Sequence, residues 1–69
     1  MNLLYGQIVE MVTEDGMRFG KIRVRGVIKK VSLELLGELQ IGDRVLVCDG
    51  IAISKEENFG DQYVSSNPG

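Results

Sequence analysis

The sequence predicts an all-β fold: a small five-stranded OB-like barrel with one helical turn and, at most, a short C-terminal helix. Short runs with apolar residues at alternate positions indicate strands, and turns that contain glycine separate these runs. The length of 69 residues allows one domain. Closing five short strands into a barrel would remove the exposed edges that a small open sheet presents. We expect this barrel to span residues 1–57 and residues 58–69 to form a tail.

The alternation of apolar residues defines five predicted strands. They cover residues 4–12, 17–25, 27–33, 44–48 and 51–53. In the first of them, a period of two places Ile8 and Glu10 on one face and Met11 on the other. Asp15-Gly16 and Asp49-Gly50 are predicted as turns, because glycine tolerates the positive φ that tight hairpins require.

Two segments have helical rather than strand character. Ser32 can cap a helix and Gly37 suits the position after a helix end, which predicts one helical turn between them. Ser54-Lys55-Glu56-Glu57 matches a capping box and predicts that a short helix begins there. Phe59 and Tyr63 stand four residues apart, so this helix would lay one apolar edge on the barrel.

The composition excludes several chemistries. The chain has no histidine and one cysteine, which removes the most common general base, an intrachain disulfide and any CxxC metal knuckle. The glycines form no nucleotide-binding fingerprint. A net charge of −2 argues against broad, charge-driven nucleic-acid binding. A non-catalytic binding or assembly module without a bound cofactor is therefore expected.

The same composition predicts a cytoplasmic protein that does not enter a membrane. No apolar run reaches the roughly 18 residues that a transmembrane helix needs. Met1–Tyr5 is too short for a signal peptide and has no basic residue ahead of it.

Four segments, taken together, resemble the HypC/HupF hydrogenase-assembly chaperones. They are GQIVE (6–10), VSLELL (31–36), IGDRVLV (41–47) and GIAIS (50–54). Their order and spacing agree with the family over about residues 6–57. The resemblance implies an OB-like barrel with a C-terminal helix. It also implies binding to a maturation partner and to the precursor of the nickel–iron hydrogenase large subunit, in the delivery of an iron–cyanide–carbonyl fragment.

Two positions depart from the family pattern. Family members begin with Met-Cys and continue to Pro-Gly, and that cysteine is the residue proposed to hold the iron fragment. Here the chain opens with Met1-Asn2-Leu3-Leu4-Tyr5-Gly6, without the cysteine and the proline. Cys48 stands where the family carries a histidine. Because low-valent iron prefers a soft, accessible thiolate, the carrier chemistry is not expected to transfer to this chain.

Cys48 is the only soft ligand and therefore the candidate metal-binding residue. The alternative is a small apolar side chain at the end of a buried strand, where free cysteines usually lie. An ionised Asp49 next to it would raise the pKa of the thiol and disfavour the thiolate.

Two groups of residues are candidates for partner binding. The first is Asn2, Leu3, Leu4 and Tyr5, because the resembled family reaches its partner with this end of the chain; the alternative is that they begin the core. The second is the basic set around the second predicted strand, represented by Lys21, Arg23 and Arg25. These cations suit an acidic partner surface, or they protect a strand edge from aggregation.

The leading hypothesis is a chaperone or accessory protein that docks on a hydrogenase large-subunit precursor, on a maturation factor, or on another metalloenzyme. The second is an OB module that binds nucleic acid through the basic residues, although only Phe19 offers a stacking aromatic there. The third is a structural homo-oligomer, since a barrel this small gains core by pairing.

Overall fold

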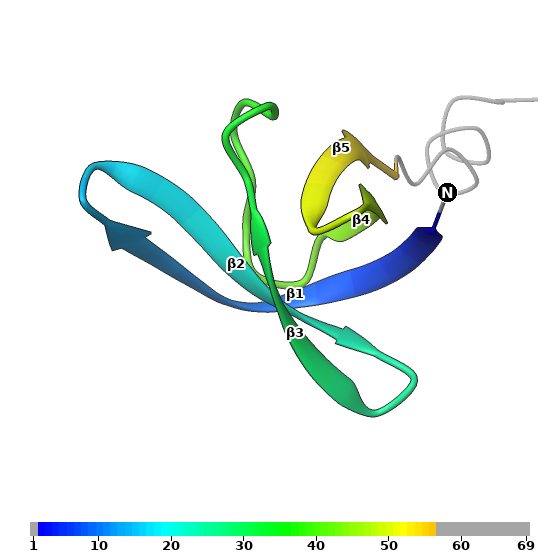
Figure 1. The fold of residues 1–69 in the computed structure, drawn as a ribbon. Coiled ribbons are helices and arrows are strands. Elements are labelled where there is room, and N and C mark those ends of the chain that lie inside the picture. The colour runs from blue at the N-terminus through cyan, green and yellow to red at the C-terminus, as the bar shows by residue number, and fades with distance from the viewer. Residues whose placement is uncertain (1, 57–69) are drawn as a thin grey trace, which may run out of the picture.

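The computed structural model describes residues 2–56 and shows a closed barrel of five strands (Figure 1). The strands are β1 (Leu3–Glu14), β2 (Met17–Val24), β3 (Val27–Ser32), β4 (Arg44–Cys48) and β5 (Ile51–Lys55). Their order around the barrel is β1-β2-β3-β5-β4, and every pairing is antiparallel except that of β3 with β5. The predicted all-β barrel is confirmed. Within residues 2–56 there is no helix long and apolar enough to cross a membrane.

Three two-residue turns connect consecutive antiparallel strands. They are Asp15-Gly16, Arg25-Gly26 and Asp49-Gly50, and both residues of each have positive φ. Positive φ at both central positions defines the type I′ turn, whose twist matches that of the strands it joins. The two predicted turns are confirmed, and Gly26 belongs to the third.

The long strand β1 pairs with two different neighbours. Its residues Leu3–Gln7 pair with β4 and Gln7–Glu14 pair with β2, with Val9 as the extra residue of a β-bulge. An extra residue reverses the alternation beyond it. The prediction that Ile8 and Glu10 share a face is therefore wrong: Ile8 is buried, Glu10 is exposed, and Met11 packs against the core.

One apolar cluster fills the barrel. Its members come from all five strands and from the connection between β3 and β4: Ile8, Ile22, Val24, Val31, Leu33, Leu39, Val45, Val47 and Ala52. No buried polar or charged residue lies among residues 2–56. The interior is therefore filled by aliphatic side chains, and any partner contact is made on the outside or at the openings of the barrel.

The helical turn predicted at Ser32–Gly37 is present as one turn of the 3₁₀ type, in which Leu36 N donates to Leu33 O over 3.2 Å. Arg18 binds the carbonyl groups of this turn. Its guanidinium donates to the carbonyl oxygens of Leu33 (3.0 Å), Gly37 (2.9 Å) and Leu36. In a longer helix, these carbonyl oxygens would accept hydrogen bonds from backbone N–H groups of the next turn. The Arg18 side chain, which comes from β2, therefore holds this connecting segment in place.

The predicted capping box does not form, because β5 is longer than expected. Ser54 and Lys55 pair with Leu46 and Val45 of β4, and Glu56 N donates to Arg44 O over 2.8 Å. Residues in a strand ladder cannot also form the first turn of a helix. The rest of the predicted helix, with Phe59 and Tyr63, lies outside the described residues.

Gly6 provides the first testable prediction. A Cβ there would lie 2.7 Å from Ile22 Cδ1, 2.9 Å from Val24 Cγ2 and 3.2 Å from Arg23 O. Because the two apolar side chains are themselves buried, they have little room to retreat. Gly6→Ala should lower the free energy of unfolding by about 1–3 kcal/mol, measured by urea denaturation.

Gly37→Ala is the matched control. No heavy atom lies within 4 Å of its ideal Cβ position, and its φ is not positive. The control should leave the urea midpoint almost unchanged. Equal destabilisation by the two substitutions would show that close packing at Gly6 is not what matters.

Candidate partner-binding surface

The structure divides the predicted docking segment Asn2–Tyr5 between two sides of β1. Gly6 and Ile8 are buried, so the period of two directs Leu4 inward and Leu3 and Tyr5 outward. Leu4 is partly buried against the core, whereas Leu3 and Tyr5 are each 50% exposed. Within the segment Asn2–Tyr5, Leu3 and Tyr5 therefore offer apolar side chains on the outer surface of the strand.

Strands β4 and β5 continue this outer apolar surface. Leu3 pairs with Cys48, which pairs with Ile51; Tyr5 pairs with Leu46. Leu46 and Cys48 alternate with the buried Val45 and Val47, so they face outward with Leu3 and Tyr5.

A β-bulge in β5 adds a further exposed apolar residue. The register slips between Leu46 and Val47, which leaves Ile53 as the extra residue, 41% exposed; Ile51 is 40% exposed. We call the resulting set the apolar outer face: Leu3, Tyr5, Leu46, Cys48, Ile51 and Ile53. Apolar side chains gathered on one sheet surface mark an interaction site more often than scattered ones do.

Charged residues border the apolar outer face on one side. The Arg44 guanidinium carbon lies 5.4 Å from the centre of the Tyr5 ring, a cation–π distance. Arg44 Nε also lies 2.8 Å from Glu56 Oε1. An apolar centre with a charged rim is the usual composition of a protein–protein interface.

Cys48 lies within the apolar outer face, and its thiol is kept protonated. Partial burial, and then the Asp49 carboxylate, raise the pKa of the Cys48 thiol above its ordinary value. Sγ lies 3.7 Å from Asp49 Oδ2, close enough to donate a weak hydrogen bond. Metal ions and electrophiles react with the thiolate, so this surrounding favours an apolar packing role for Cys48. Among residues 2–56, no group of three or more Cys, Asp or Glu side chains is placed to hold a metal ion.

The predicted basic residues lie apart from this face. Lys21, Arg23 and the turn residue Arg25 belong to the β2–β3 hairpin, and β2 lies on the opposite side of β1 from β4. Lys21 Nζ is 3.8 Å from Glu10 Oε1, whereas Arg23 and Arg25 have no ion-pair partner within the described part of the chain. The structure therefore brings Leu3, Tyr5 and Cys48 together and leaves the cations as a separate feature.

Sequence reasoning missed the contribution of Leu46, Ile51 and Ile53 to this surface. A signal was present, because β4 is apolar at consecutive positions from Val45 to Cys48. A strand that is apolar on both faces is typically covered on both faces. What the alternation does not give is the register that places Leu46 and Ile51 next to residues of β1.

The pH dependence of Cys48 alkylation tests the proposed protonation. Asp49→Asn removes a carboxylate that raises the thiol pKa, so a larger thiolate fraction should form below that pKa. Iodoacetamide should then modify Cys48 about threefold faster near pH 8. Asparagine tolerates the positive φ of Asp49, so the turn should persist.

Asp15→Asn, in a turn of the same geometry, is the control and should leave the alkylation rate unchanged. If both variants react at the wild-type rate, Asp49 has no influence on the thiol.

The family model of the HupF/HypC family matches residues 5–58 of the chain. No curated protein and no solved structure gives a match. The matched range includes β1 from Tyr5 onward, all of β2 to β5, and every residue of the apolar outer face except Leu3. It covers well over half of the 69 residues, and the chain therefore belongs to the HupF/HypC family.

Proposed function

We propose that this chain is a hydrogenase-maturation chaperone that acts by docking on a protein partner, namely a large-subunit precursor or a maturation factor. Membership of the HupF/HypC family supports the general role. The apolar outer face is the single observation that carries the docking mechanism. It offers outward apolar side chains on three adjacent strands, of which Leu3 and Tyr5 are the most exposed.

The proposal does not include delivery of iron by this chain's own thiolate. Asn2 and Cys48 occupy the places of the family's cysteine and histidine. An amide oxygen is a poor ligand for soft, low-valent iron, and the pKa of the Cys48 thiol is raised. The chain would instead hold its partner in a state in which other components can load the iron fragment. It would act in the cytoplasm and would not catalyse a reaction. Exchange of the hydrogenase client for another metalloenzyme would use the same docking face.

An affinity pull-down from cells of the source organism tests this function. The tagged wild-type chain should recover a hydrogenase large-subunit precursor or its maturation partner, identified by mass spectrometry. Leu3→Ser with Tyr5→Ser should reduce that recovery at least tenfold, because loss of two aromatic or aliphatic anchors removes about 2 kcal/mol or more of binding free energy. Leu4 is left intact, since it packs against the core.

Leu35→Ser with Ile41→Ser is the matched control. Both residues are more exposed than Leu3 and Tyr5, at 68% and 65%, and both lie in the connection between β3 and β4. The control should recover the partner as the wild type does. Recovery of a different metalloenzyme would redirect the proposal to another client, and recovery of neither class would refute it.

A further inference from the structure

The barrel is closed between β3 and β5 by very little pairing. Ser32 and Ile51 are the one residue pair that these parallel strands share within residues 2–56, and Ser32 N donates to Gly50 O over 2.9 Å. Residues Val27–Val31 of β3 pair with β2 on one side and with no described strand on the other. Among the described residues, this part of β3 is therefore an open strand edge.

The direction of the Ser32 hydrogen bond shows which backbone groups this edge presents. In an antiparallel pair, successive residues direct their N–H and C=O groups alternately toward the partner strand and away from it. Since the Ser32 N–H points away from β2 to Gly50, the N–H and C=O groups of Lys30 and Ile28 point the same way. These are the groups that an added strand would use.

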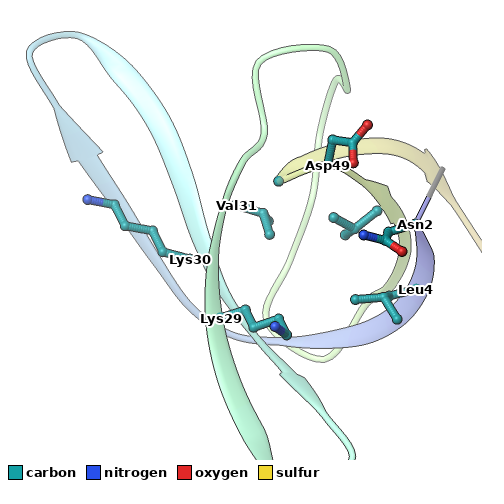
Figure 2. A pocket seen from close by; sticks show the side chains of 8 residues that line it. Asn2, Leu4, Lys29, Lys30, Val31 and Asp49 are labelled. Atoms are coloured by element: carbon teal, nitrogen blue, oxygen red, sulfur yellow. The ribbon is translucent and has the colours of Figure 1, made fainter.

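A cavity of about 280 Å³ lies beside this edge. Figure 2 shows it between β3 and the first residues of β1, with the Asp49-Gly50 turn at one end. Leu4, Val31 and Val47 give it an apolar lining. The Lys30 side chain points away (Figure 2), toward Glu14 at 2.7 Å and over the Phe19 ring, so Lys30 lines the cavity with its backbone.

The β2–β3 hairpin carries cations that form no ion pair within residues 2–56, whereas Asp49 lines the far end of the cavity. Of the eight Lys and Arg residues, five form ion pairs within residues 2–56: Arg18, Lys21, Lys30, Arg44 and Lys55. The three cations without such a partner are Arg23, Arg25 and Lys29, and all belong to the β2–β3 hairpin. Lys29 lines the cavity and lies two residues from Val31, on the same face of β3.

We propose that the edge of β3 receives an extended, acidic segment of a protein partner as an added strand. The backbone of that segment would bond to the N–H and C=O groups of Ile28 and Lys30. One of its apolar side chains would enter the cavity against Leu4, Val31 and Val47, and a carboxylate two residues further along the segment, on the same face, would face Lys29. Strand addition with a pocket for alternate side chains is a recurring mode of peptide recognition. The inference rests on the proposed function and specifies which part of the protein partner would bind: an extended, acidic segment.

Other occupants fit the site less well. A second copy pairing antiparallel through its own β3 edge would bring the Lys29 side chains of the two copies together, and like charges across a strand pair are destabilising. A single-stranded nucleic acid would need exposed aromatic rings for stacking, but Lys30 lies 4.7 Å above the Phe19 ring. The cavity is also slightly below the range of about 300–1,000 Å³ usual for small-molecule sites.

A titration followed by NMR tests the inference on the full chain. The probe is an acetylated hexapeptide, Thr-Val-Thr-Glu-Thr-Glu, in which valine and glutamate stand two residues apart and so share one face of a strand. Its counterpart carries lysine in place of glutamate. With the acidic peptide the amide signals of Ile28 and Lys30 should move and their hydrogen exchange should slow. The lysine peptide should bind at least about fivefold more weakly.

Ile28→Pro removes one edge N–H without removing a β2–β3 hydrogen bond, and proline is tolerated on such edges. It should weaken binding of the acidic peptide about tenfold, whereas Ile28→Thr, which keeps the N–H, should bind as the wild type does. Lys29→Glu should weaken binding roughly fivefold, and Lys55→Glu, the same charge change on β5, should not. If Ile28→Pro does not fold, the Lys29→Glu and Lys55→Glu pair decides.

Three results would overturn the inference. They are signal changes confined to the apolar outer face, no binding at millimolar peptide, and tighter binding of an oligothymidine ten-mer than of the acidic peptide. Movement of the Ile28 and Lys30 signals on dilution of the protein alone would identify a second copy instead and would also overturn it. The titration contains no hydrogenase component, so its failure is independent of the pull-down and leaves the proposed function standing.

Discussion

The barrel depends on one strand that serves two neighbours. Residues Leu3–Gln7 of β1 pair with β4, residues Gln7–Glu14 pair with β2, and Gln7 takes part in both pairings. Here β2 lies so close to β1 that a Cβ at position 6 would come within 3 Å of the Ile22 and Val24 side chains, which are 2.7 and 2.9 Å from its ideal place. Just beyond it, Ile8 exchanges two backbone hydrogen bonds, each 2.8 Å long, with Gly42 and Asp43 of the connection before β4. Gly6–Ile8 therefore joins the β2–β3 hairpin to the β4–β5 hairpin, and the position of these two hairpins relative to each other depends on this segment.

This arrangement separates two kinds of outer surface. On the β4 side of β1, the register aligns Leu3 with Cys48 and Tyr5 with Leu46, which gathers apolar side chains that the sequence distributes over 50 residues. On the β2 side, the β2–β3 hairpin extends away from β4 and β5 (Figure 1). It carries Arg23, Arg25 and Lys29, which form no ion pair within residues 2–56. The exposed apolar side chains and these cations therefore lie on different parts of the surface. A partner that used both would need an apolar patch and an acidic extended segment, each at its own location.

The sequence predicted the Asp-Gly hairpin turns well because their causes are local. An Xaa-Gly pair between alternating runs specifies a type I′ hairpin through the φ that glycine allows. The errors arise where a distant residue decides. The bulge at Val9 follows from pairing with β2, and the extended β5 follows from its ladder with β4. The candidate site follows the same rule: Leu3, Tyr5 and Cys48 could be named individually, but only the register shows that Leu46 and Ile51 lie beside them, and Arg23 and Arg25 do not.

The place of Cys48 within the apolar outer face constrains what this thiol can do when a partner binds. Desolvation already raises its pKa, and the Asp49 carboxylate adds to the effect. A protein that covered Leu3, Leu46 and Ile51 would remove more water from Sγ and would disfavour the thiolate further, unless it brought a cation to that point. A thiol that is covered by a docked protein is therefore a poor metal ligand, because metal binding needs an accessible thiolate. The Cys48 thiol of this chain therefore suits contact with other apolar side chains better than it suits metal binding.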